Sequence, residues 1–188
     1  MLAGGRATRF GGDKLAATYR GDTLLRSTVS RLAEVCDEVV VVLSATGAEP
    51  ELPEGVRIAR DSNEGEGPLA GLYDGLMACR SELVVVAGGD MPDLQPSVLA
   101  EMLRVAGERE AAAVALADGD DVRPLPCVLR MLEALDATHT LLHVGGRRLR
   151  SMLEALHPVV IAEDVWTAMD PDRRTLFDVD VPGDLGTP

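Results

Sequence analysis

Short valine-rich apolar runs alternate along this chain with amphipathic stretches, and this alternation restricts the fold more than any other feature of the sequence. The runs are residues 38–44, 56–60, 82–88 and 111–117, followed by weaker ones at 127–129, 158–162 and 175–180. Apolar residues at helical spacing fill the stretches between them, at residues 23–36, 69–79, 97–106 and 147–156. Apolar strands joined by helices predict an α/β fold in three layers, a mostly parallel sheet with helices on both faces.

The length of 188 residues predicts one domain spanning residues 1–188. Only residues 1–3 precede the glycines of the first loop, whereas a strand usually has about five or six residues. We therefore expect the first strand to be clipped. No apolar run approaches the roughly 18 residues that cross a bilayer, so the sequence favours a soluble, cytoplasmic protein without a membrane partner.

Charge is distributed unevenly. The 31 acidic residues exceed the 18 basic ones, giving a net charge of −13, which argues against nucleic acid as a partner because the surface repels phosphate backbones. Residues 1–31, however, hold six cations against two carboxylates. This locally basic start predicts a small anionic ligand. The three cysteines and three histidines show no disulfide framework or zinc spacing.

Residues 2–14, L-A-G-G-R-A-T-R-F-G-G-D-K, place four glycines and three cations between a strand and a helix. Glycines let the backbone N–H groups approach a ligand closely, and the cations supply positive charge, so the loop is typical of a phosphate cradle. It is not a Walker loop, because Asp13 precedes the lysine and Leu15 follows it. A basic surface loop without a ligand is the alternative interpretation.

Lys14 is the only lysine of the chain, against 17 arginines. A lysine offers a compact point charge where the guanidinium fork of an arginine is too wide. We therefore predict that Lys14 contacts phosphate.

Three further motifs follow in order: G-P-L-A-G-L at 67–72, G-G-D-M-P at 88–92 and F-D-V-D-V-P-G-D-L at 177–185. Together with the first loop they closely resemble the molybdenum cofactor guanylyltransferases, which have a Rossmann-like nucleotidyltransferase fold. The resemblance implies transfer of GMP from GTP to the terminal phosphate of molybdopterin carrying molybdenum, with release of pyrophosphate and a requirement for Mg²⁺. Molybdoenzymes or cofactor-delivery proteins are the protein partners that it implies.

Asp90 directly follows the run at 82–88, so its carboxylate is expected at the carboxyl end of the sheet beside the first loop. Mg²⁺ prefers a few carboxylates together with phosphate oxygens and water, and Asp90 is the predicted metal ligand. The alternative is a helix cap or turn aspartate ahead of Pro92. Lys14, Arg9 and Asp90 are the predicted catalytic residues; the lysine, Arg6 and Arg9 would neutralise the triphosphate and the leaving pyrophosphate.

The nucleotide site that the resemblance implies comprises the first loop, the start of the second motif and two aspartates: Leu2, Ala3, Gly4, Gly5, Arg6, Lys14, Asp61, Pro68, Leu69, Ala70, Gly71 and Asp90. Asp61 matches the family position that holds the guanine edge, where a carboxylate accepts from the N1–H and 2-amino groups. Capping a turn with Ser62 and Asn63 is the alternative role. Ser44 replaces an asparagine that the family often carries, which weakens the argument for guanine.

The acceptor side is assigned to Arg147, Asp178 and Asp180. Arginines suit a pterin phosphate, although a solvated helix face is an equal alternative for the neighbouring Arg148 and Arg150. Asp178 and Asp180 are two apart in an expected strand and would share one face. The family often has asparagines at this pair, so their role is left between metal ligand, substrate contact and structure.

Three rival functions remain open. Transfer of CMP to the same cofactor and transfer of a nucleotide to another small phosphate are the rivals among enzymes. A non-catalytic nucleotide-binding protein is the third. The presence of Lys14 and Asp90 argues against it, whereas the expected clipped strand argues slightly for it.

Overall fold

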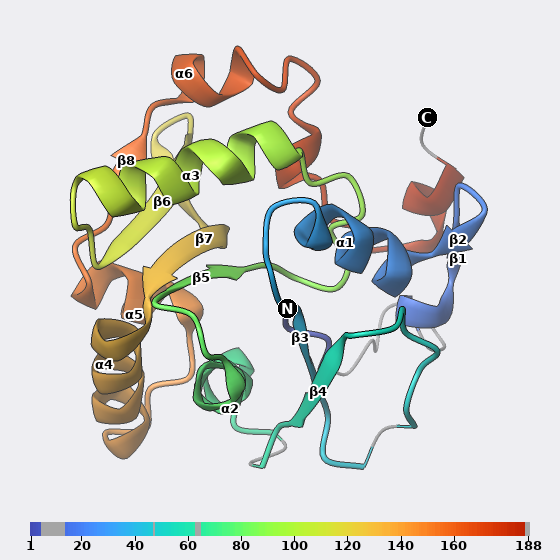
Figure 1. Cartoon of the computed structure of the whole chain (residues 1–188), viewed down its shortest axis with the longest axis horizontal. Coiled ribbons are helices and arrows are strands. Elements are labelled where there is room, and N and C mark those ends of the chain that lie inside the picture. Colours follow the sequence, from blue (N-terminus) through green and yellow to red (C-terminus); the bar gives the residue numbers. More distant parts are fainter. Residues whose placement is uncertain (5–13, 47, 63–64, 187–188) are drawn as a thin grey trace.

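The computed structural model describes residues 1–4, 14–46, 48–62 and 65–186, and Figure 1 shows the arrangement of their helices and strands. The strands are β1 (Thr18–Tyr19), β2 (Asp22–Thr23), β3 (Val40–Leu43), β4 (Arg57–Arg60), β5 (Leu83–Val86), β6 (Ala113–Asp118), β7 (Asp121–Arg130) and β8 (Val159–Ile161). The α-helices are α1 (Leu24–Ala33), α2 (Pro68–Ala78), α3 (Pro96–Glu108), α4 (Met131–His143), α5 (Leu149–Ala155) and α6 (Glu163–Thr167). Short 3₁₀ turns are η1 (Lys14–Ala16), η2 (Arg174–Leu176) and η3 (Pro182–Gly186).

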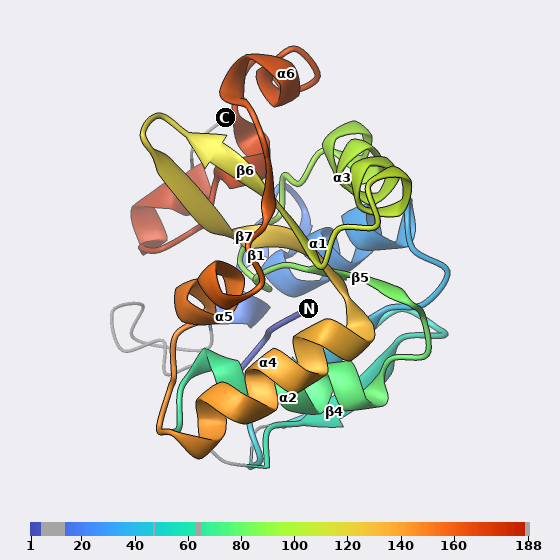
Figure 2. The ribbon, with the colours of Figure 1, turned by 90° about the vertical axis from the view of Figure 1, so that its left-hand side faces the viewer.

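Residues 1–3 form the central strand of the sheet. Leu2 makes parallel bridges to Val42 of β3 and to Gly88 just after β5. Its N–H donates to the carbonyl of Ala87 at 2.9 Å, and the N–H of Ala3 donates to that of Val42 at 2.8 Å. The spatial order is therefore β4, β3, residues 1–3, β5, β7, β6 and β8. The short start that the sequence analysis singled out thus occupies the middle of the sheet, and both views place the N-terminus inside the molecule (Figures 1 and 2).

The predicted α/β class is confirmed, but the sheet is mixed. The β3–β4 pair, the β6–β8 pair and the bridges of Leu2 are parallel, whereas β7 runs antiparallel to both β5 and β6. The reason is a tight hairpin: Asp118 pairs with Asp121 across a turn at Gly119, and strands joined by so short a connection have to be antiparallel. The sequence analysis expected only residues 127–129 to be extended here.

The expected last strand at residues 175–180 is wrong. Residues 174–176 form the turn η2, and the chain that follows is tied by one backbone hydrogen bond, from the Val179 N–H to the Asp90 carbonyl at 3.0 Å. Asp178 and Asp180 therefore do not share a strand face. Helix α4 was not predicted either, because its fully buried residues, Ala134 and Thr138, are small and give a weak apolar stripe.

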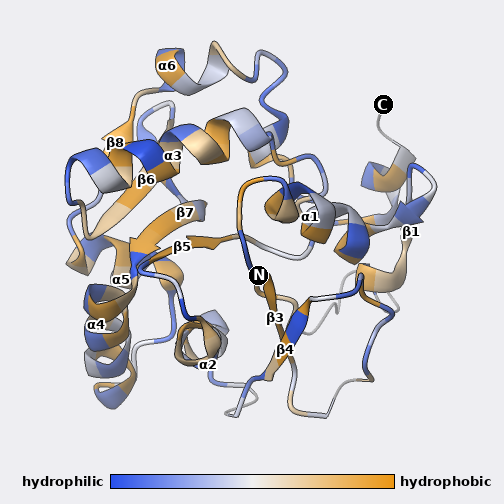
Figure 3. Cartoon of the chain, in the orientation of Figure 1, coloured by the Kyte–Doolittle hydropathy of each residue, from blue (hydrophilic) through white to orange (hydrophobic). Residues whose placement is uncertain are grey.

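Two apolar layers sandwich the sheet, as the three-layer prediction requires. Leucines and valines of α1 and α3, with Trp166 of α6, pack on one face, and leucines of α2, α4 and α5 pack on the other. Figure 1 shows α3 and α6 on the opposite side of the sheet from α2 and α4, and Figure 3 shows β3, β5 and β7 as apolar strands between them. In the part of the chain that the structure describes, no helix is long and apolar enough to span a membrane.

Helix α2 lies unusually close to the sheet at Gly75. A Cβ atom there would lie 2.7 Å from Cγ2 of the buried Val42. We expect Gly75→Ala to destabilise the protein by roughly 1–3 kcal/mol through overpacking. Gly107, near the end of α3, has open space where a Cβ would stand, so Gly107→Ala should stabilise by about 0.5–1 kcal/mol. Urea unfolding measures both changes, and equal effects of the two substitutions would refute the close contact.

Candidate functional site

The loops that follow the three central strands converge at one edge of the sheet. Gly4, directly after residues 1–3, lies against the backbone of Ser44, which follows β3. A Cβ atom at Gly4 would lie 3.3 Å from the Ser44 nitrogen. After β5, the N–H of Gly89 donates to the Leu2 carbonyl at 2.8 Å. These are the carboxyl ends of parallel strands, which is where α/β sheets bind ligands.

Lys14 joins two of the predicted site aspartates at this edge. Its Nζ donates to Asp90 Oδ2 at 2.8 Å and to Asp180 Oδ1 at 3.4 Å. The lysine side chain is only 13% exposed. Burial by itself would lower the pKa of Lys14, but the hydrogen bonds and charges of the two aspartates outweigh that effect and raise the pKa above its ordinary value. The site therefore holds a permanent positive charge.

Asp178 is a third carboxylate near Asp90 and Asp180. Burial raises the pKa of Asp178, and the like charges of Asp180 and Asp90 raise it further, while Arg123 opposes them. These three carboxylates outnumber the Lys14 ammonium and the Arg123 guanidinium near them, and the excess of negative charge favours a further cation. Within the described ranges no three potential ligands already stand at coordination distance. That finding is compatible with Mg²⁺, which usually takes one or two carboxylates and completes its shell with phosphate oxygens and water.

The carboxylate of Asp90 folds back over the preceding turn. A Cβ atom at Gly88 would collide with Asp90 Oδ1, so only glycine leaves room for this side-chain position. The Asp90 carbonyl accepts the Val179 N–H described above, which ties the turn after β5 to the segment that carries Asp178 and Asp180. The motif G-G-D thus determines which way the Asp90 carboxylate points and how its turn is attached to the segment of Asp178 and Asp180.

Asp61 occupies the other end of the edge, directly after β4. Its N–H donates to the Leu43 carbonyl at 2.8 Å. A Cβ atom at Gly71 in α2 would lie 3.6 Å from Asp61 Oδ2. The next residue is held by a different carboxylate, since the Ser62 N–H and hydroxyl both donate to Asp74, at 2.7 and 2.9 Å. Asp61 therefore stands between the end of β4 and the first turns of α2.

Helix α2 begins one residue before the helical stretch expected at 69–79, with Pro68 as its first residue after a left-handed Gly67 at φ +88°. The next three predicted nucleotide-site residues are buried in the first turns of this helix: Leu69, Ala70 and Gly71. The N–H groups of Leu2 and Ala3 donate to backbone carbonyls of the neighbouring strands, as described above.

Arg147 lies beside the start of α2. A Cβ at Gly67 would lie 3.0 Å from the Arg147 carbonyl, and the guanidinium donates to the Gly65 carbonyl at 3.0 Å. The predicted acceptor-side arginine is therefore adjacent to the predicted nucleotide-side helix. Its neighbour Arg150 forms a two-point ion pair with Asp121, at 2.7 and 2.8 Å, which favours the structural alternative for that residue.

Gly5, Arg6 and Arg9 lie outside the described residues, so their predicted roles are untested. A different set of polar residues escaped the sequence analysis. Tyr19, Asp93 and Arg174 are joined by hydrogen bonds and lie on the segments that carry Lys14, Asp90 and Asp180. The only signal available was a second aspartate three residues after Asp90, ahead of a helix, which is also typical of an ordinary turn.

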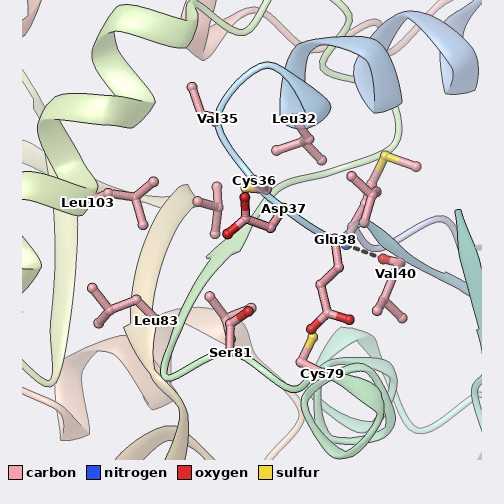
Figure 4. Close-up of a pocket in the computed structure, with 14 residues that line it drawn as sticks. Leu32, Val35, Cys36, Asp37, Glu38, Val40, Cys79, Ser81, Leu83 and Leu103 are labelled. Carbon is pink, nitrogen blue, oxygen red and sulfur yellow. Dashed lines mark hydrogen bonds between the residues drawn. The ribbon is translucent and has the colours of Figure 1, made fainter. Parts of the chain in front are cut away.

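A separate cavity of about 250 Å³ opens at the opposite edge of the sheet, beside the starts of β3 and β5 (Figure 4). Apolar side chains line it together with Cys36, Cys79, Glu38 and the amino group of Met1. Burial lowers the pKa of that amino group to about 6, and its nitrogen donates to the Val40 carbonyl at 2.8 Å. None of the predicted site residues lines this cavity.

Comparisons with known proteins agree with the geometry. Residues 1–160 match the family described as "MobA-like NTP transferase domain". A probable molybdenum cofactor guanylyltransferase of Chloroflexus aggregans is 33% identical, over 98% of this chain and 89% of its own length. A molybdenum cofactor guanylyltransferase of Burkholderia vietnamiensis is 36% identical, over 87% and 83%. The crystal structure of molybdopterin-guanine dinucleotide biosynthesis protein A from Archaeoglobus fulgidus superposes with a TM-score of 0.78 at 22% identity, covering 98% and 92% of the two chains.

The crowding of carboxylates predicts an unusual pH dependence at Asp178. Because the folded state raises the pKa of this group, wild-type stability falls as pH rises from the ordinary value of 3.8 through the raised one. Asp178→Asn should therefore increase the unfolding free energy at pH 7, by on the order of 0.5 kcal/mol since solvent screens a half-exposed carboxylate. The gain should vanish below pH 3.8.

Asp184 supplies a control of opposite sign. The N–H groups of Val181 and Asp180 donate to its carboxylate and hold its pKa below the ordinary value, so Asp184→Asn should lower stability at pH 7. Thermal unfolding between pH 3 and pH 8 measures both variants. A wild-type advantage over Asp178→Asn at neutral pH would contradict the assignment.

Proposed function

Because this chain belongs to the family of MobA-like NTP transferases, which includes the molybdenum cofactor guanylyltransferases, we propose that it transfers GMP from GTP to the terminal phosphate of molybdopterin carrying molybdenum and releases pyrophosphate. It is an enzyme of the nucleotidyltransferase class that acts in molybdenum cofactor biosynthesis. The observation that carries the proposal is the position of Lys14, which bridges Asp90 and Asp180 where the loops after the central strands meet.

The chemistry requires alignment and neutralisation of charge rather than a protein nucleophile. A phosphate oxygen of the acceptor attacks the α-phosphorus of GTP, the bond from that phosphorus to the bridging oxygen breaks, and pyrophosphate leaves with the electron pair. The Lys14 ammonium neutralises negative charge on the triphosphate as it develops. Its carboxylate partners keep it protonated at neutral pH, so it acts as a fixed charge and takes no part in proton transfer.

The donor set fits Mg²⁺. Asp90 and Asp180 present hard oxygen ligands within reach of one ammonium, and Asp178 adds a third carboxylate nearby. When bound, Mg²⁺ would neutralise phosphate oxygens and orient them. Asp90, fixed by the turn over Gly88, is the residue we assign as its principal ligand. Asp180, which is more exposed and held by the longer of the two lysine contacts, is the second candidate.

Guanine would lie at the Asp61 end of the edge. The carboxylate beside Gly71 can accept from two neighbouring donors, a pair that guanine presents and that cytosine and adenine lack. The pterin phosphate would enter from the side of Arg147, Asp178 and Asp180.

The direct test is pyrophosphate release from GTP, CTP, ATP or UTP in the presence of Mg²⁺ and molybdopterin. GTP should support turnover, and omission of either Mg²⁺ or molybdopterin should abolish it. A preference for CTP would replace the proposal with cytidylyl transfer. If none of the four nucleotides supports turnover, a non-catalytic nucleotide-binding protein would be favoured.

Replacement of Lys14 should separate catalysis from folding. We expect Lys14→Ala to lower kcat by about 10²-fold or more, because it removes the ammonium that is proposed to neutralise the triphosphate. The circular dichroism spectrum should stay unchanged. Lys14→Arg should also be slow, since the wider guanidinium does not fit between Asp90 and Asp180. Full activity of the arginine variant in the pyrophosphate assay would refute the role of a compact point charge.

Replacement of Asp61 should erase the choice of base. In nucleotide titrations, Asp61→Ala should lose roughly tenfold or more of the preference for GTP, because each charge-assisted hydrogen bond contributes on the order of 1.5 to 3 kcal/mol. Asp61→Asn keeps the size but turns an NH₂ group toward a guanine donor, so its selectivity should also fall. Equal affinity of the wild-type protein for GTP and CTP would remove the guanine assignment.

A further inference from the structure

Hydrogen bonds join Tyr19, Asp93 and Arg174 into a network, here called the Asp93 network. Asp93 is 4% exposed and Tyr19 is 2% exposed. The Tyr19 hydroxyl donates to Asp93 Oδ2 at 2.7 Å, and Arg174 Nε donates to the same oxygen at 2.8 Å. A terminal nitrogen of Arg174 also donates to the Tyr19 hydroxyl, at 2.8 Å, and to Asp93. All three side chains are thus joined to one another.

Each member of the network stands on a segment that carries one of the charged site residues. Tyr19 follows Lys14 by five residues, Asp93 follows Asp90 by three, and Arg174 precedes Asp180 by six. These segments are far apart along the chain, so local structure alone does not fix their relative positions. The Asp93 network is therefore a three-way junction between the segments that deliver the ammonium and its two carboxylate partners.

Packing around the network transmits its position to the site. The Tyr19 ring lies in one apolar cluster with Val179, the residue between Asp178 and Asp180. The guanidinium of Arg174 lies 4.3 Å over the ring of Phe177, the residue just before that pair. A displacement of either side chain would therefore move the acidic segment directly.

Further hydrogen bonds brace the same segments. The Gln95 N–H donates to the Thr175 hydroxyl at 3.3 Å. The buried Asp170 carboxylate accepts the backbone N–H groups of Arg174 and Thr175, at 3.0 and 2.6 Å, which fixes the turn η2 that presents the Arg174 side chain. The guanidinium consequently has little freedom to follow Asp93 if that residue moves.

A buried ionic network is not an efficient way to stabilise a fold, because desolvation of the charges offsets much of their attraction and apolar residues of similar volume often do as well. Directional hydrogen bonds do provide fixed geometry, and catalytic groups have to be held within about 0.5 Å of their productive positions. We propose that the Asp93 network is a positioning device that holds Lys14, Asp90 and Asp180 in their mutual arrangement. The kinetic part of this inference rests on the proposed function.

The single lysine allows a test that is independent of catalysis. In protein labelled with ¹³C and ¹⁵N at lysine, one side-chain signal reports the surroundings of the Lys14 ammonium. We would compare this signal in the wild type with that in Tyr19→Phe and Arg174→Gln, and use the conservative Arg174→Lys, which adds a second lysine, only in the kinetic assay. Arg104→Gln is the matched control, because Arg104 pairs with Glu101 and Glu108 on the exposed surface of α3. Thermal unfolding would establish that each variant is folded at the assay temperature.

We expect the Lys14 signal to move toward that of a free lysine in Tyr19→Phe and Arg174→Gln, and to stay in place in Arg104→Gln. In the pyrophosphate assay, kcat should fall about threefold to tenfold for Tyr19→Phe and more than tenfold for Arg174→Gln, with KM for GTP changed less than threefold. Arg174→Lys should recover part of the loss.

An unmoved Lys14 signal in both folded variants would overturn the positioning role, as would a loss of kcat no larger than that of Arg104→Gln. If the Lys14 signal moves in both variants but the wild-type protein shows no guanylyl transfer, the positioning role would be supported and the proposed function overturned. The two ideas can therefore fail separately.

Discussion

The structure depends on the backbone hydrogen bonds of residues 1–3, which join two otherwise separate parts of the sheet. On one side Ala3 donates to β3, and on the other Leu2 donates to the end of β5. Because backbone ladders fix direction and register together, this short segment aligns the ends of β3 and β5 at one edge. Gly4 and Gly89 both lie at that edge, so the pairing of three residues fixes where the chain leaves the sheet there.

At the site itself, like charges are kept together by what surrounds them. Burial raises the pKa of Asp178, and repulsion from the like charges of Asp180 and Asp90 raises it further. Lys14 offsets part of the repulsion, and the turn over Gly88, the Val179 N–H and the Asp93 network hold the segments against the remainder. An arrangement of this kind stores electrostatic free energy that a cation or a ligand can release on binding.

Much of the fold and part of the site could be predicted from the sequence. Continuous valine runs identified β3 and β5, and the helical spacing of apolar residues at 69–79 identified α2, because these signals are local. The antiparallel direction of β7 was missed, since a D-G-D-D turn does not reveal how far its flanking strands extend. Lys14 and Asp90 were each predicted as site residues from local signals, Lys14 as the only lysine in a glycine-rich loop and Asp90 because it follows the run at 82–88. The Asp93 network was not, because its partners lie up to 155 residues apart in the chain and only the folded protein brings them together.

The isolation of Lys14 as the only lysine also determines how this protein can be handled on a solid support. Amine-directed coupling to a sensor chip or resin has a single side-chain target, and that target lies between Asp90 and Asp180. A protein attached through this side chain would be tethered at its own candidate site. Attachment through one of the many exposed carboxylates, such as those on the outer face of α3, would leave that edge of the sheet open.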